Sequence, residues 1–261
     1  MEPMTELTAI SAVAFAPDPF MAQRDCVGHQ GQRRLRRAHV LVIGAGGAGT
    51  AAVLSLATAG IGQLTAVDPQ SFEPDNFNRS PIARLSDVGI PKVKLLERFL
   101  AGRECLKFHP VVGSCETLAP SDLSNVSCIL SASNTAASRR HGARLAMSLK
   151  VPHVGVGAFD AREKLGGIIT TWIPGRPDLA CQACFLGEET DPQAESLLGP
   201  VVACLGAWAA HVVVRLITTN LPVNDPEIIN LIEVDLERVH LDGLTVRRRQ
   251  DCSVCRGVTD V

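Results

Sequence analysis

Four of the nine cysteines stand in two Cys-x-x-Cys pairs, Cys181 with Cys184 and Cys252 with Cys255. Each pair can wrap one edge of a metal ion, and two pairs supply the four soft ligands of a closed, tetrahedral structural zinc site. The pairs lie far apart in the chain, so such a site would tie a distant loop to the C-terminal end. A redox Cys-x-x-Cys and thiols with no shared role are the alternatives.

A glycine-rich turn, Gly44-Ala-Gly46-Gly47-Ala-Gly, follows an apolar run at 39–43. Glycines let the backbone approach a phosphate, and the N-terminus of a following helix supplies N–H donors and partial positive charge. Asp68 stands 24 residues after Gly44 at the end of the next apolar run, where a carboxylate suits ribose hydroxyls. The pattern predicts a nucleotide site, with a tight packing turn as the alternative.

The elements that position these residues alternate in type. This alternation predicts an α/β fold of the Rossmann type, with a mostly parallel sheet and helices on both faces. After it we expect an antiparallel C-terminal extension that the zinc site closes. The expected strands are 39–43, 63–67, 107–112, 126–131, 153–156, 167–172, 228–235 and 240–248, and the expected helices are 50–59, 92–100, 136–149 and 201–218.

Length and charge limit the classes of function. The chain has 261 residues, 46% of them hydrophobic, and a formal net charge of -2. We expect a flexible tail over 1–20 and one domain over 21–261. A net charge this close to zero produces no strong positive potential that would attract nucleic acid. The basic run at 33–37 is interpreted as a solvated helix face. No apolar run reaches the ~20 residues of a membrane span and no basic start marks a secretory signal, so a cytoplasmic location is expected.

Several further stretches carry a family resemblance. The segment Asp68-Pro-Gln-Ser-Phe-Glu-Pro-Asp-Asn76-Phe-Asn-Arg79-Ser resembles the E1-like superfamily, which includes the ThiF and MoeB enzymes. The segment 27–35, Gly60-Ile-Gly62 and the stretch Val88-Gly-Ile-Pro-Lys92-Val are similar to the family as well, and the two cysteine pairs stand where it holds zinc. The resemblance covers about residues 24–257.

The resemblance implies an activity and a set of site residues. It implies adenylation with Mg-ATP of the C-terminal carboxylate of a ubiquitin-like sulfur-carrier protein or a biosynthetic peptide, by a homodimer. It places Asp68 at the ribose, and Gly44, Gly46 and Gly47 at the nucleotide. Asn76, Arg79 and Lys92 would face the phosphates, where Arg and Lys stabilise the charge that builds on them. Arg24 would reach the partner subunit's site. A surface ion pair is the alternative for Arg79 and Lys92.

Two departures from the family pattern matter. Ser133 stands where the family has an aspartate for magnesium, beside a retained Asn134. Glu116, Asp122 and Asp191 are the candidate acids to replace that aspartate. No acceptor cysteine lies between 185 and 203, and Cys204 is expected to be a buried packing thiol. The missing cysteine favours adenylation without a thioester. Together the two departures leave, as the alternative, a silent pseudo-E1 subunit that binds a catalytic partner. A nicotinamide oxidoreductase, which the glycine turn and Asp68 alone would suggest, is the third hypothesis.

Overall fold

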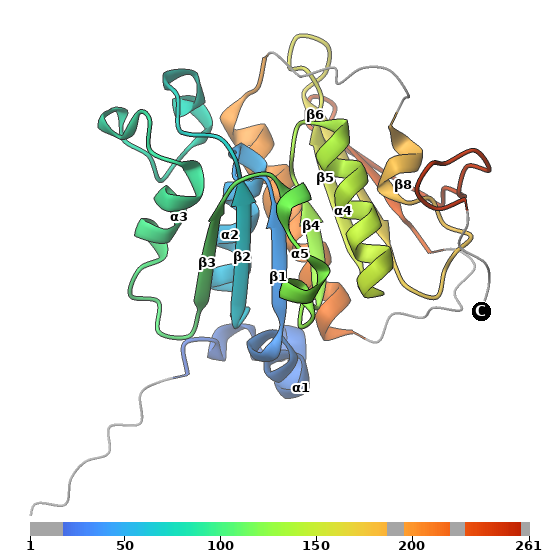
Figure 1. Ribbon diagram of the computed structural model, residues 1–261, viewed down its shortest axis with the longest axis horizontal. Coiled ribbons are helices and arrows are strands. Elements are labelled where there is room, and N and C mark those ends of the chain that lie inside the picture. Colours follow the sequence, from blue (N-terminus) through green and yellow to red (C-terminus); the bar gives the residue numbers. More distant parts are fainter. Residues whose placement is uncertain (1–17, 187–195, 220–227, 257–261) are drawn as a thin grey trace, which may run out of the picture.

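A single eight-stranded sheet organises the part of the chain that the computed structural model describes, residues 18–186, 196–219 and 228–256 (Figure 1). The strand order is β3-β2-β1-β4-β5-β6-β7-β8. Neighbours from β3 to β5 pair in parallel, and β5 through β8 pair antiparallel. The predicted fold class, antiparallel extension included, is confirmed. The strands are β1 His39–Ile43, β2 Gln63–Asp68, β3 Lys107–Val112, β4 Cys128–Ser131, β5 His153–Ala158, β6 Gly166–Trp172, β7 Leu231–Asp235 and β8 His240–Leu244.

Helices cover both faces of this sheet (Figure 1). One face packs against α1 (Arg24–Arg37), α2 (Gly47–Thr58), α3 (Lys92–Leu100) and α5 (Gly199–Thr218). The other face packs against α4 (Ala136–Leu149) and the segments that carry the cysteine pairs. All five residues of β1 are buried, as expected for a parallel strand between two layers, whereas the five residues of the edge strand β8 are exposed.

The carboxyl ends of β1, β2 and β4 form the edge where the nucleotide was predicted. Each strand runs in the same direction, so the segments after Ile43, Asp68 and Ser131 meet there. The opposite edge carries α1, whose exposed arginines confirm the solvated face predicted for 33–37. Asp18 and Phe20, at the end of the predicted tail, contact α1 through Arg24 and Arg36.

Several boundaries and one burial prediction are corrected. Helix α2 begins at Gly47 and not at residue 50, and the last two strands are the shorter Leu231–Asp235 and His240–Leu244. Cys204 is half-buried on α5 instead of buried. Helix α5 is long and apolar enough to pass the length and composition test for a membrane span, a test that a core helix also passes. It packs against α2, β5 and β6 in the core, and the cytoplasmic location stays a prediction.

Candidate functional site

The glycine turn closes tightly on the loop that follows β4. Gly44 has φ +98, and a Cβ there would lie 2.8 Å from the Ala132 carbonyl oxygen and 2.9 Å from the Ser133 nitrogen. No atom lies within 4 Å of where a Cβ of Gly46 would be, so space opens directly at the N-terminus of α2. The turn is therefore packed against the loop after β4 on one side and open at the N-terminus of α2 on the other, so the helix N–H groups are accessible to an anion.

Asp68 holds the turn to the end of β2. Its carboxylate accepts the Ala45 N–H at 2.7 Å through Oδ2 and the Gln70 N–H at 2.7 Å through Oδ1, and the residue is 5% exposed. Each carboxylate oxygen keeps a further acceptor position. The side chain is therefore fixed at the predicted ribose position and retains acceptor capacity there.

Arg79 reaches the turn from the 3₁₀ helix Pro74–Arg79. A Cβ at Gly47 would lie 3.1 Å from the Arg79 Cβ, and the guanidinium donates to the Asp75 carbonyl oxygen at 2.6 Å. It also pairs with the Asp75 carboxylate at 3.8 Å, so the predicted surface ion pair exists beside the open turn. Asn76 is buried and accepts the Glu73 N–H at 3.3 Å, which caps this helix.

Lys92 completes a cluster of charges with Asp68 and Arg79. Its ammonium donates to Gln70 Oε1 at 2.8 Å, and Gln70 itself is fixed by Asp68. Burial lowers the pKa of Lys92, the Asp68 carboxylate opposes that shift, and Arg79 adds to it. Two cations thus lie close enough to interact beside the N-terminus of α2, an arrangement that suits a polyphosphate.

The loop after β4 lies at the same edge. The Ser133 hydroxyl oxygen is buried without a hydrogen-bond partner, and the Ser133 carbonyl accepts from Arg139 Nε at 2.8 Å. Asn134 is exposed. Of the three acids considered as replacements, Glu116 is exposed and hydrogen-bonded to Ser114. The Asp122 side chain and Asp191 lie outside the described residues. Within the described residues, no acidic side chain bonds the Ser133 hydroxyl.

Arg24 lies away from this edge. It pairs with Asp18 at 2.7 Å, and the neighbouring Gln23 donates to the carbonyl of Ala59 just after α2. The glycine turn is at the other end of this 12-residue helix, about 18 Å away at 1.5 Å per residue. Arg24 therefore does not contribute to the site of its own chain.

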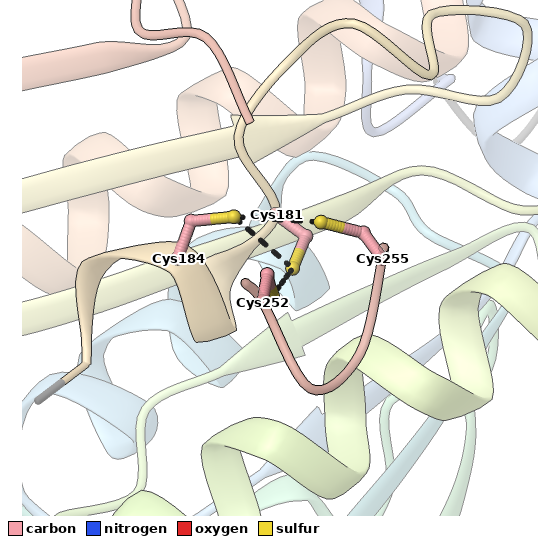
Figure 2. Close-up of side chains that lie close together, drawn as sticks. All are labelled: Cys181, Cys184, Cys252 and Cys255. Atoms are coloured by element: carbon pink, nitrogen blue, oxygen red, sulfur yellow. Dashed lines mark hydrogen bonds between the residues drawn. The ribbon is translucent and has the colours of Figure 1, made fainter. Parts of the chain in front are cut away.

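The four cysteines meet on the α4 face of the sheet (Figure 2). All are buried, their sulfurs lie within 4.8 Å of one another, and the neighbouring separations are 3.9, 3.8 and 3.4 Å. Four Zn–S bonds of about 2.3 Å in a tetrahedron require sulfurs about 3.8 Å apart. The arrangement fits a closed zinc site that leaves no ligand position open.

Buried histidines do not add a second centre. Burial lowers the pKa of His153 to about 3, and its Nε2 is 2.8 Å from Ser131 Oγ. Burial also lowers the pKa of His141. A neutral histidine bonded to a core serine supports packing, and we assign no hydride chemistry to either residue.

The chain matches the ThiF family over residues 20–254. The chain belongs to the ThiF family. It is 28% identical over 240 residues to the SAMP-activating enzyme E1 of Haloferax volcanii, covering 88% of this chain and 85% of that protein. It is 30% identical over 240 residues to the heterocyst protein HesA of Trichormus variabilis, covering 87% and 84%. ThiF proteins are E1-like adenylyltransferases, so the predicted enzyme class is confirmed and the oxidoreductase hypothesis is wrong.

Other ThiF relatives are longer. The chain covers 51% of the adenylyltransferase and sulfurtransferase uba4 of Aspergillus niger, to which it is 29% identical over 255 residues. The crystal structure of E. coli MccB with ATP superposes with a TM-score of 0.71 at 19% identity, covering 93% of this chain and 75% of that one. This structural likeness confirms the fold.

The sequence did not single out three residues that contact the predicted site residues or lie within the cysteine cluster. Gln70 links Asp68 to Lys92, Arg139 reaches the Ser133 carbonyl, and Gln182 is buried inside the first cysteine pair. Gln70 lies two residues after Asp68, and this closeness in sequence could have indicated that it lies at the same site. Arg139 is one of three arginines on α4, and which one turns toward the sheet requires the packed structure.

Proposed function

We propose that this chain is an ATP-dependent adenylyltransferase that activates the C-terminal carboxylate of a ubiquitin-like sulfur carrier or a peptide. The observation that carries the proposal is the position of Arg79 beside the open N-terminus of α2, with Lys92 held by Gln70 close enough to interact with it. The related enzyme from Thermus thermophilus is named a sulfur carrier protein adenylyltransferase, and a solved MccB structure holds the peptide MccA. We further propose that residues 21–261 form one domain.

The site residues would act on the phosphates and not on a proton. A substrate carboxylate is already ionised at neutral pH, so its oxygen attacks the α-phosphorus and the bond to the bridging oxygen of pyrophosphate breaks. Negative charge grows on the departing pyrophosphate. Arg79, Lys92 and the N–H groups of α2 would stabilise it, with Asp68 at the ribose and Gly44, Gly46 and Gly47 allowing close approach.

Magnesium would be held mainly by the nucleotide. Mg²⁺ keeps several waters and commonly binds through substrate phosphates with one or two protein groups. Ser133, whose hydroxyl is unpartnered, and Asn134 lie at the correct edge to supply neutral oxygens. Zinc in the cysteine site would be structural, because four thiolates complete its coordination.

Binding and exchange assays test the activity. We expect calorimetry to give micromolar ATP binding that magnesium strengthens, and no binding of NAD. With a peptide ending in a free carboxylate we expect ATP–pyrophosphate exchange, and with the amidated peptide none. ATP binding with no exchange for carrier proteins or free-acid peptides would favour the silent pseudo-E1 subunit, whereas no ATP binding at all would contradict the nucleotide site.

We propose that the enzyme is a homodimer formed through the outer face of α5. In the first half of this face Ala203 and Ala207 are exposed and Trp208 is half-buried, where a solvated helix usually carries charges, and the exposed His211 and Arg215 follow only in its second half. Arg24, which lies far from its own site, would then be free to approach the site of the other subunit. Ala207→Glu is expected to shift the sedimentation coefficient to that of a monomer. Ala101→Glu, at an exposed position after α3, serves as the control; equal behaviour of the two variants contradicts this interface.

A further inference from the structure

A small cavity of about 30 Å³ lies beside β5, outside the glycine turn. Its floor is formed by β5 and β6, including Gly155, Gly157 and Thr170. Its walls come from Arg139 on α4 and from Gln182 in the first cysteine pair. The volume admits a group of only a few atoms.

Gln182 brings an unused acceptor into this cavity. The residue is 6% exposed, and its buried Oε1 has no hydrogen-bond partner among the residues that the structure describes. Leaving a buried acceptor unpaired costs about 1–3 kcal/mol, so a donor is missing from this position. A Cβ at Gly155 would lie 2.1 Å from Gln182 Nε2 and 2.5 Å from Thr170 Oγ1, so the glycine is what leaves room for this side chain.

Arg139 connects the cavity to the nucleotide edge. Its guanidinium lies 3.3 Å from where a Cβ of Gly157 would be, and its Nε donates to the Ser133 carbonyl at 2.8 Å. The Ser133 nitrogen in turn lies against Gly44. Direct contacts therefore run from the cavity through Arg139 and the Ser133 loop to the glycine turn, with the positive charge of Arg139 between them.

We propose that Gln182 is a specificity-determining residue that recognises the last peptide group of the substrate, an inference that rests on the proposed function. The N–H of the terminal residue would donate to Gln182 Oε1, and the terminal carboxylate would lie on the Arg139 side, toward Ser133. A peptide N–H is the donor that the acceptor lacks, and the limited volume favours a terminal glycine. Because Gln182 lies between Cys181 and Cys184, the cysteine site would also position a substrate contact.

A pair of synthetic octapeptides tests this assignment, one ending in Gly-Gly and the other in Gly-glycolic acid, whose ester oxygen replaces the terminal N–H donor at nearly the same size. The measurement is kcat/KM for ATP–pyrophosphate exchange. Wild-type enzyme is expected to prefer Gly-Gly by roughly 5- to 150-fold, the effect of leaving a buried acceptor unpaired. Gln182→Leu is expected to remove this preference by lowering activity on Gly-Gly alone. Gln182→Glu, which keeps an acceptor oxygen, is expected to restore it.

Controls separate recognition from folding and from failure of the reaction. Gln250→Leu changes an exposed glutamine beside the second cysteine pair and is expected to keep the preference. ATP affinity and zinc content are expected to be unchanged in Gln182→Leu. Wild-type enzyme that uses both peptides equally, as it would if the cavity held only a water, overturns the Gln182 assignment and leaves adenylation standing. Absence of exchange with either peptide overturns the assignment together with peptide adenylation.

Discussion

Replacing Lys92 with alanine is expected to lower the rate of ATP–pyrophosphate exchange by about 100- to 1,000-fold, the typical cost of losing one group that stabilises transition-state charge. Lys92 is held by Gln70, which is itself held by Asp68, so the ammonium is aimed before ATP arrives. A preorganised cation stabilises developing charge without having to reorganise during the reaction. Arg79→Ala is expected to have an effect of the same order.

Whether the Lys92→Ala substitution lowers kcat or raises KM is as informative as the size of the loss in activity. If Lys92 acts on the charge that develops during transfer, kcat falls together with kcat/KM, while the dissociation constant of ATP changes less. If Lys92 only holds the ground-state phosphates, KM rises and kcat is kept. Single-turnover measurement of acyl-adenylate formation, beside calorimetry with ATP, distinguishes the two outcomes.

Lys94 offers a matched control on the same helix. It lies two residues further along α3 and pairs with the exposed Glu97 at 3.0 Å. Lys94→Ala removes the same charge and an exposed ion pair worth little to stability, about 0–1 kcal/mol. Unchanged exchange in Lys94→Ala with a large loss in Lys92→Ala supports the phosphate role. Equal losses would instead point to the general charge of the surface.

The core of the fold could be predicted because its signals are local. The central strands β1 and β4 are short apolar runs, and the helices α3 and α4 begin and end at the residues expected from periodicity. The start of α2 was misplaced because Gly46 and Gly47 resemble loop residues. The structure continues the helix to Gly47, since the unpaired N–H groups of that first turn face open space at the site.

The site was predictable in its charged residues but not in its polar links. Asp68, Arg79 and Lys92 follow a family pattern, and the structure brings them together. Gln182 carried no signal, because glutamine between two cysteines is ordinary in sequence and only burial makes its unpaired oxygen costly. The same holds for Ser133, whose neutral side chain suggested a loss of function before its place beside Gly44 was known.

Removing the metal from the cysteine site is expected to lower the melting temperature by roughly 8–16 °C. A ligand present at a thousand times its dissociation constant contributes about 4 kcal/mol to stability, and each kcal/mol shifts the transition by about 2–4 °C in a domain of this size. Purified protein is expected to contain one zinc per chain by elemental analysis. Cys184→Ser is expected to lose the metal and the same stability, because three thiolates no longer close the tetrahedron.

The exposed Cys105 provides the control, since Cys105→Ser removes a thiol outside the cluster and is expected to change neither zinc content nor melting temperature. A zinc-free protein with an unchanged transition would contradict a structural role.

The loss of stability should begin where the site joins distant segments. Ala180 donates to the Val246 carbonyl at 2.9 Å and Arg248 to the Asp178 carbonyl at 2.9 Å, so backbone pairing accompanies the cysteine cluster. These bonds join the segments that carry the two cysteine pairs, so the metal holds both partners in place. Hydrogen exchange after chelation is therefore expected to accelerate first at 178–180 and 246–248, while β1 and β4 stay protected. Uniform acceleration across the sheet would mean that the metal supports the whole fold cooperatively and not this junction alone.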